Sequence, residues 1–236
     1  MKKTIGILGG MGPEATAYMY NLIIKHTQVE TDQDHIRVII FSNPEIPPRT
    51  DAILGKGLSP VPLLIEGIRK LKDAGADFVI MPCVTAHYFI PEVLTQIDVP
   101  FLSLLDESLS WAKENLAGLK RVGLISSTGT LVSKLFHHTF GKAGIEVLAL
   151  EDKDQQEVME AIFGPKGIKA GFSSGPSKEQ IVRAAEKLTA GGAEAILAGC
   201  TELPLVLKAE DISVPLIEPM EILAQKSILE AGYKVR

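Results

Sequence analysis

The chain has 236 residues, of which 46% are hydrophobic and 22% charged, a balance typical of a globular protein with a sizeable core. Its formal net charge of −5 gives no reason to expect nucleic acid or an anionic membrane surface as a partner, and no apolar segment approaches the length of a membrane span. The two cysteines form no CxxC motif, which argues against a disulfide framework or a cysteine metal site and favours a reducing, cytoplasmic compartment.

Short apolar runs alternate with longer amphipathic stretches, a pattern that predicts an α/β fold with parallel sheets. In chain order, the expected strands are Thr4–Leu8, Ile36–Phe41, Phe78–Met81, Pro100–Leu104, Arg121–Ile125, Glu146–Leu150, Ala195–Ala198 and Val214–Ile217. Helices fill the intervals, and two of them, Pro62–Ala74 and Lys178–Ala190, are each followed by a glycine that would end the helix (Gly75 and Gly191). Residues 43–60 and 164–176 are rich in proline, glycine and serine, so we expect long loops over a functional site.

The two halves of the chain resemble one another. KTIGILGGMGPEAT (residues 3–16) is echoed by KRVGLISSTGTLVS (120–133), and AGADFVIMPCVTAH (74–87) by GGAEAILAGCTELP (191–204). Both block pairs have the same offset, since 123 − 6 for the glycines and 200 − 83 for the cysteines each give 117. The repeat predicts two related βα lobes, which we expect to comprise residues 1–98 with 214–236, and residues 99–213.

Cys83 and Cys200 each follow a predicted buried strand and precede a helix or turn. Ligands of parallel α/β sheets bind beyond the carboxyl ends of the strands, and a nearby helix N-terminus stabilises a thiolate. A single free cysteine is most often an inert core residue. Two cysteines at the same position of duplicated lobes favour a functional pair instead.

The first predicted strand runs into a glycine-rich turn at residues 9–12, directly before Pro13, which suits the start of a helix. Residues 10–15 formally match the dinucleotide fingerprint, but the second strand lacks the acidic residue that would bind a ribose. A nicotinamide-dependent dehydrogenase is therefore a distant alternative. The matching turn of the second half, Ser126–Thr130, supplies hydroxyls, and both turns are better suited to holding a small carboxylate.

Other polar residues have either a structural or a functional interpretation. Arg49 lies in a proline-stiffened loop and could grip a carboxylate, as could Lys169, although either could be a solvated loop cation. Glu202 could tune the second cysteine or relay its proton, or it could simply start a helix. His87 is more often structural in such a setting, and the pair at 137–138 points two ways on a helix, so we expect no metal site.

The chain closely resembles the cofactor-independent aspartate/glutamate racemase family. The resemblance runs nearly end to end, through ILGGMGPEAT, FSNPEIPPRT, ILGKG, GADFVIMPCVTAH, STGT, AGCTEL and VPLIEPM. It implies two α/β lobes related by a pseudo-twofold axis, an active site in the cleft between them, no cofactor and a homodimer.

By the same resemblance, Cys83 and Cys200 are the two acid/base thiols, and the substrate is a small dicarboxylate amino acid, aspartate first and glutamate second. The positions that match substrate-holding residues of the family are Met11, Gly12, Arg49, Thr85, Thr128, Lys169 and Thr201. Arg49 and Lys169 would grip the side-chain carboxylate. One thiolate would remove the α-proton while the other thiol returns one to the opposite face, so both sulfurs should have similar pKa values.

One position departs from the family pattern: Val84 stands where an asparagine usually follows the first cysteine. Val84 can contribute a contact to substrate through its main chain only, and the lost amide corresponds to roughly 1–3 kcal/mol if its partner stays unpaired. Val84 therefore leaves open a catalytically silent dicarboxylate-binding homologue. A maleate isomerase, which also uses two cysteines and binds a dicarboxylate, is a second alternative. An arylmalonate decarboxylase needs the second thiol alone, so the presence of Cys83 argues against it.

Overall fold

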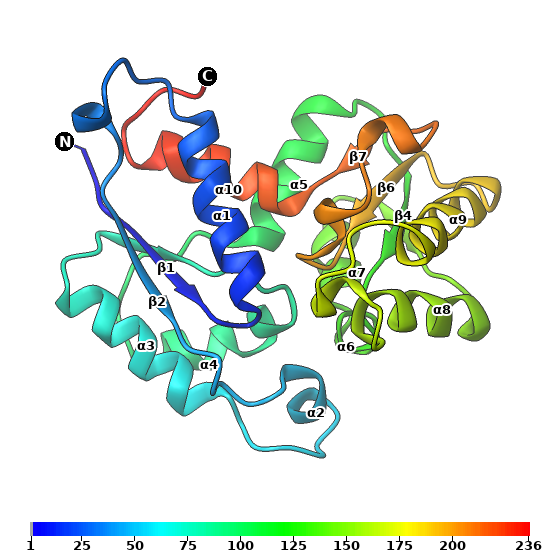
Figure 1. The fold of residues 1–236 in the computed structure, drawn as a ribbon, viewed down its shortest axis with the longest axis horizontal. Coiled ribbons are helices and arrows are strands. Elements are labelled where there is room, and N and C mark those ends of the chain that lie inside the picture. Colours follow the sequence, from blue (N-terminus) through cyan, green and yellow to red (C-terminus); the bar gives the residue numbers. More distant parts are fainter. Residues whose placement is uncertain (1) are drawn as a thin grey trace. The chain divides into compact units, whose positions relative to one another are not determined.

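The computed structural model describes residues 2–236 (Figure 1). Contacts divide this chain into two units. The first comprises the residues up to Glu107 together with Met220–Arg236, and the second comprises Ser108–Pro219. The strands are β1 Ile5–Gly9, β2 Val38–Ser42, β3 Phe78–Ile80, β4 Arg121–Ile125, β5 Glu146–Leu148, β6 Ala195–Ala198 and β7 Leu216–Ile217. The α-helices are α1 Pro13–His26, α2 Arg49–Ile53, α3 Val61–Asp73, α4 Ile90–Leu94, α5 Leu104–Asn115, α6 Thr128–Ser133, α7 Leu135–Gly141, α8 Asp152–Phe163, α9 Pro176–Ala190 and α10 Pro219–Glu230. Short 3-10 helices are η1 Asp32–Asp34, η2 Thr85–Phe89, η3 Ile168–Ala170, η4 Leu203–Leu205 and η5 Ala209–Asp211.

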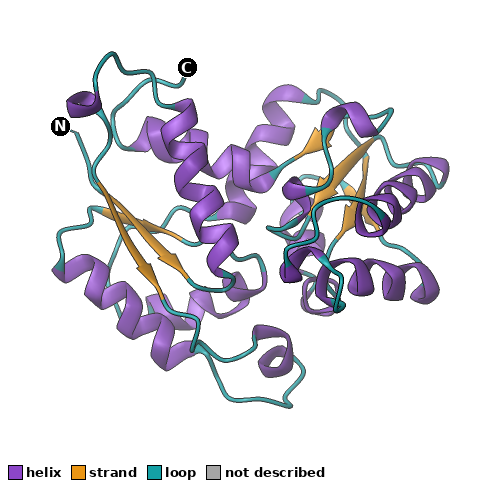
Figure 2. Ribbon diagram, in the orientation of Figure 1, coloured by secondary structure: helices purple, strands orange, loops and turns teal. Residues whose placement is uncertain are grey.

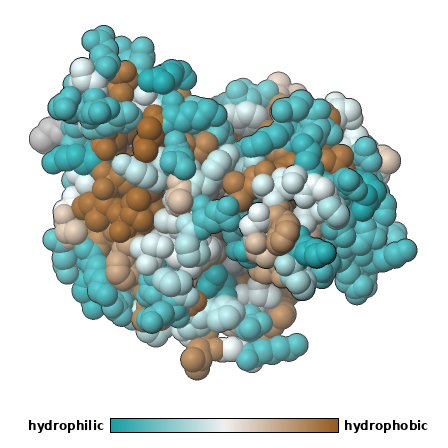
Figure 3. Space-filling model, viewed as in Figure 1, coloured by the Kyte–Doolittle hydropathy of each residue, from teal (hydrophilic) through white to brown (hydrophobic). Residues whose placement is uncertain are grey.

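The first unit is built on a parallel sheet of order β2-β1-β3, with helices packed against it (Figure 2). All five residues of the central strand β1 are buried, which is why it reads as an apolar run rather than an alternating one. Strand β2 forms the edge and is only partly buried; a hydrophobic area lies over this part of the unit in Figure 3, and Ile40 of β2 is 40% exposed. Helix α3 covers the sheet with a buried stripe at helical spacing, Leu64, Ile68 and Leu71.

The second unit repeats this plan with a parallel sheet of order β5-β4-β6-β7. Its central strand β4 is buried except for its first residue, and β6 is buried throughout. Helix α9 takes the place of α3, and its buried residues include Ile181, Ala185 and Leu188. These three numbers exceed those of the α3 stripe by 117, the offset found in the sequence.

Two equivalent glycines show how closely the units match. A Cβ on Gly6 would lie 2.8 Å from Ala76 Cβ and 3.4 Å from Leu71 Cβ. A Cβ on Gly123 would lie 2.8 Å from Leu188 Cβ and 3.0 Å from Ala193 Cβ. The residues approached are themselves offset by 117 (188 − 71 and 193 − 76). In each unit the central strand therefore needs glycine, because the same positions of the covering helix and its following turn leave no room for a Cβ.

The structure differs from the sequence expectations in several places: the stretches expected as long loops contain α2 and η3, and strands such as β2 and β7 have other bounds than expected. Residues Pro100–Leu104 do not form a strand: Phe101 makes a single bridge to Val79, and α5 already begins at Leu104. Helix α9 ends at Ala190 with Gly191 as its C-cap, as expected, and Gly192 follows in the left-handed conformation with φ of 95°, the same value as Gly75 after α3. Within residues 2–236, no helix combines the length and apolarity needed to cross a membrane.

Candidate functional site

Each cysteine follows a buried strand at the carboxyl edge of its own sheet. Cys83 comes after β3 and Cys200 after β6, and both are free thiols with exposed fractions of 5% and 8%. This edge is where parallel α/β sheets bind ligands. We use the name Cys83 cluster for Cys83, Thr85, His87 and Arg49 in the first unit, and Cys200 cluster for Cys200, Thr201, Glu202 and Lys169 in the second.

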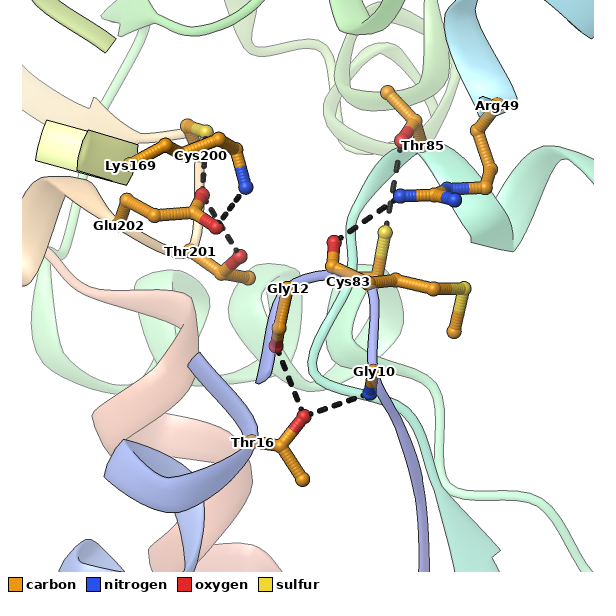
Figure 4. Close-up of polar contacts among 11 residues, drawn as sticks. Gly10, Gly12, Thr16, Arg49, Cys83, Thr85, Lys169, Cys200, Thr201 and Glu202 are labelled. Carbon is orange, nitrogen blue, oxygen red and sulfur yellow. Dashed lines mark hydrogen bonds and ion pairs between the residues drawn. The ribbon is translucent and has the colours of Figure 1, made fainter. Parts of the chain in front are cut away.

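In the Cys83 cluster, the sulfur lies 3.6 Å from the Oγ1 of Thr85, and either atom can donate to the other (Figure 4). The turn that carries Cys83 is braced by His87. Leu104 N–H donates to His87 Nε2 at 3.2 Å, so the ring proton must lie on Nδ1, which donates to the Cys83 carbonyl at 2.8 Å. His87 therefore ties the cysteine turn to the first residue of α5.

His87 acts as a neutral structural residue. Its side chain is buried and lies edge-on to Phe101 with ring centroids 5.5 Å apart. Burial lowers the pKa of His87 from 6.5 to about 4, although its backbone hydrogen bond to Cys83 and the charge of Asp106 oppose the shift. A ring that stays uncharged at neutral pH cannot supply a proton to the site there.

Arg49 is the first residue of α2, which packs against η2, and Figure 4 shows its guanidinium extending toward Cys83 and Thr85. Its Nη1 donates to the carbonyl oxygens of Ile46 and Pro47 at 2.8 and 2.9 Å. Its Nη2 donates to the Met11 carbonyl at 3.3 Å, while the buried Nε has no hydrogen-bond partner within residues 2–236. Backbone carbonyl oxygens thus hold the Arg49 side chain in place. Because arginine carries five N–H donors and these bonds do not use all of them, donors remain for a carboxylate.

The glycine-rich turn is closed by Thr16 of α1, a residue that the sequence analysis did not single out. Thr16 Oγ1 accepts from Gly10 N–H at 2.9 Å and donates to the Gly12 carbonyl at 3.0 Å (Figure 4). Gly10 has φ of 94°, and a Cβ there would lie 2.3 Å from the backbone of Asn43, so only glycine fits. One amide of the turn is therefore already bonded within the protein and cannot hold a substrate carboxylate.

Two further predicted contacts in the first unit are buried apolar side chains. Met11 and Val84 are 5% and 4% exposed, and Met11 belongs to the same core cluster as Cys83. Contacts from these two residues to a substrate would therefore have to come mainly from their backbone.

In the Cys200 cluster, Glu202 lies at the centre. This carboxylate is 3% exposed and accepts from Cys200 Sγ at 3.0 Å and from Thr201 Oγ1 at 3.2 Å, both on Oε2 (Figure 4). Its other oxygen, Oε1, forms an ion pair with Lys169 Nζ. Lys169 is 29% exposed and also lies 5.5 Å from the centroid of the Phe163 ring.

Burial, together with the charge of Glu202, raises the pKa of the Cys200 thiol well above its ordinary value; Lys169 opposes the shift. The neighbour of Cys83 is a neutral hydroxyl instead. The two sulfurs thus do not have the similar surroundings that the duplication led us to expect, because the residues two positions after them differ.

The second turn is also partly engaged by its own unit. Ser127 caps α6, its hydroxyl accepting from Thr130 N–H at 3.4 Å. The N–H of Thr128 donates to the Met159 sulfur at 3.2 Å, and Gln155 Nε2 donates to the Ser126 carbonyl at 2.9 Å. A thioether is a weak acceptor, so the Thr128 N–H is held less firmly than it would be by a carbonyl oxygen. Neither Met159 nor Gln155 carried a motif by which the sequence could have identified it.

The structure therefore brings predicted residues into contact within each unit: Cys83 with Thr85 and Arg49 with the Met11 carbonyl in the first, and Cys200, Thr201 and Lys169 with Glu202 in the second. Among residues 2–236, no group of three or more histidine, cysteine, aspartate or glutamate side chains is arranged to hold a metal ion.

Comparison with known proteins identifies the family. The model of the Asp/Glu/Hydantoin racemase family matches residues 8–227. A broad-specificity amino-acid racemase, RacX of Bacillus subtilis strain 168, is 28% identical over 233 residues, covering 95% of this chain and 96% of that protein. The structure of an aspartate racemase from Picrophilus torridus is similar with a TM-score of 0.87 and 31% identity, covering 99% of this chain and 96% of that one.

A more distant solved structure supports the architecture alone. Glutamate racemase isoform RacE1 of Bacillus anthracis has a TM-score of 0.65 at 16% identity, with 98% of this chain and 82% of that one covered. The predicted α/β fold with two parallel sheets is confirmed. On the family match and its end-to-end relatives, the chain belongs to the Asp/Glu/Hydantoin racemase family and is an isomerase that racemises amino acids.

Proposed function

We propose that this racemase interconverts the enantiomers of an acidic amino acid, aspartate first and glutamate second, by proton transfer to and from two thiols without a cofactor. The observation that carries the proposal is the duplication itself. Cys83 and Cys200 follow equivalent strands of two equivalent units, so each unit supplies one thiol with its own polar neighbours.

The chemistry assigns one thiol to each face of the α-carbon. A thiolate removes the α-proton from one face, and a thiol delivers a proton to the other, which inverts the centre. In the reverse direction the roles exchange, so both cysteines are needed for either enantiomer. The charge that develops during the reaction must be stabilised by positive or N–H groups, and Arg49 supports such a role with its unpaired Nε and fixed position.

An acidic substrate is favoured by the cations in the two clusters. Arg49 can make a bidentate contact with a second carboxylate, and Lys169 adds a positive charge in the other unit, although it is paired with Glu202. The similarity to a protein described as an aspartate racemase supports aspartate as the first substrate to try.

The test is proton NMR of L- and D-aspartate, then of both glutamates, with pure protein in D2O and a thiol reductant, combined with chiral chromatography. The proposal expects loss of the α-proton signal and formation of the opposite enantiomer. Cys83→Ser and Cys200→Ser should each abolish racemisation, whereas the exposed-site variant His138→Gln should retain it.

If the protein racemises neither aspartate nor glutamate, the proposed substrate class is refuted. Saturable aspartate binding without exchange would indicate a silent binding homologue, and formation of fumarate from maleate would indicate a maleate isomerase. A reducing, cytoplasmic compartment belongs to the proposal because both thiols must stay unoxidised. So does the homodimer, which sedimentation analysis of the pure protein would test.

A further inference from the structure

The side chain that contacts each sulfur comes from the same position of the repeat. Subtracting 117 pairs Glu202 with Thr85, just as it pairs Cys200 with Cys83. Each of these residues directs its polar group at the sulfur two positions earlier. The position two residues after the cysteine therefore contacts the sulfur in both units, but it is a neutral hydroxyl in the first unit and a carboxylate in the second.

The two neighbours differ in what they can donate. A carboxylate only accepts hydrogen bonds, so the 3.0 Å contact between Cys200 Sγ and Glu202 Oε2 requires the proton to be on the sulfur. A hydroxyl can donate as well as accept, so Thr85 can donate to Cys83 when the sulfur is a thiolate. Hydrogen-bond chemistry alone thus favours a thiol in the second unit and allows a thiolate in the first.

Lys169 allows the Glu202 carboxylate to stay charged although it is buried beside Cys200. A carboxylate removed from water is costly unless it is paired and hydrogen-bonded, and Glu202 is 3% exposed. Lys169 neutralises its charge through Oε1, which leaves Oε2 to accept from Cys200 and Thr201. The sequence predicts that Lys169 grips a substrate carboxylate; in the structure its Nζ pairs with Glu202.

We propose that the two thiols rest in different protonation states, with Cys200 as the proton donor and Cys83 as the proton acceptor, and that the Lys169–Glu202 pair sets this polarity. The charged groups beside Cys200 are Glu202 and Lys169; Arg49 extends toward Cys83, and His87, bonded to the Cys83 carbonyl, is neutral at pH 7. The raised pKa of the Cys200 thiol agrees with the assignment. Glu202 is a positioning residue in this scheme, acting through Cys200.

The proton count closes over one turnover. The Cys83 thiolate takes the α-proton, and the electron pair left on the α-carbon takes the S–H proton of Cys200. The enzyme is then left as Cys83 thiol and Cys200 thiolate. It returns to its resting state when Cys83 loses one proton to water and Cys200 gains one from water. Catalytic use of this polarity rests on the proposed racemase function, but the resting protonation states do not.

Alkylation of the full-length protein without substrate tests the polarity directly. Iodoacetamide reacts with thiolates, and tryptic cleavage after lysine or arginine places the cysteines in separate peptides, residues 73–113 and 188–208. Quantifying both peptides by mass spectrometry across pH gives a midpoint for each cysteine, which does not depend on how accessible the sulfur is. We expect a lower midpoint for Cys83 than for Cys200.

Two variants make the test specific. Glu202→Gln removes the negative charge but keeps the size, and it should lower the Cys200 midpoint by at least about one pH unit, a tenfold gain in thiolate at a given pH below it. Glu210→Gln, the same change at an exposed residue of η5, should leave both midpoints unchanged. Thr85→Glu should raise the midpoint of Cys83, because it introduces at the equivalent position the carboxylate of the second unit.

Equal midpoints in the unaltered protein, or a Cys200 midpoint that Glu202→Gln does not lower, would overturn the proposal. Different midpoints without any racemisation would retain the polarity and refute the proposed function. Racemisation with equal midpoints would support the proposed function and refute the polarity.

Discussion

Replacing the buried His87 should change how folding stability depends on pH. The pKa of His87 is about 4 in the folded chain against an ordinary value of 6.5, with burial as the main cause. Because its folded pKa is lowered, an unfolded histidine binds a proton between pH 6.5 and 4 while the folded one does not. Stability supplied by the neutral ring is therefore complete above pH 6.5 and declines as the pH falls through this window. A shift of this size corresponds to about 3 kcal/mol.

His87→Gln removes the titration but keeps one donor for the Cys83 carbonyl and one acceptor for Leu104 N–H. At pH 7 the variant should be less stable by about 1–2 kcal/mol, since it loses the aromatic contact with Phe101 and some hydrogen-bond geometry. Between pH 6.5 and 4 it should avoid the loss of about 3 kcal/mol that the parent suffers. The two stability curves should therefore cross, and the variant should be the more stable protein at pH 4.

The measurement is urea unfolding at half-unit steps from pH 7 to 4, followed by fluorescence of the single tryptophan, Trp111 of α5. The exposed-site variant His138→Gln serves as control and should follow the parent curve. Parallel curves for the parent and His87→Gln would show that folding does not lower the pKa of His87, and the buried, neutral role derived for the ring would be wrong.

Four further substitutions test the packing of the two units, the role of Arg49 and the hydrogen bonds of Glu194. Gly6→Ala and Gly123→Ala should each lower the free energy of unfolding by about 1–3 kcal/mol, because a Cβ would lie 2.8 Å from a neighbouring Cβ in both units; unchanged urea midpoints would contradict the shared packing. Arg49→Lys should raise KM for an acidic amino acid by about tenfold or more, since lysine cannot make the bidentate contact; a KM equal to that of the parent would remove Arg49 from substrate binding. The pKa of Glu194 is lowered by two backbone N–H donors, so its stabilisation is present above its ordinary pKa of 4.5 and is lost as the pH falls through the lower folded value. Glu194→Gln should flatten the stability curve below pH 4.5, and an unaltered curve would argue against these bonds.

Much of the architecture followed from the sequence. The offset of 117 predicted two equivalent units, and buried parallel strands were recognisable because they read as continuous apolar runs. The expected strand at residues 100–104 failed because its apolar pattern does not distinguish a strand from the start of a buried helix, and Leu104 begins α5 with its N–H bonded to His87. Local pattern cannot anticipate a helix start that depends on a side chain 17 residues away.

What the sequence by itself determined is the repeat, the place of Cys83 and Cys200 after equivalent strands, and the family, because these depend on periodicity and motif spacing. What only the tertiary structure decided is the set of partners around each sulfur. Lys169 reaches Glu202 across 33 residues, and Arg49 is held by a carbonyl 38 residues away. Such contacts depend on how loops fold back over the sheet edge, which a local sequence pattern does not specify.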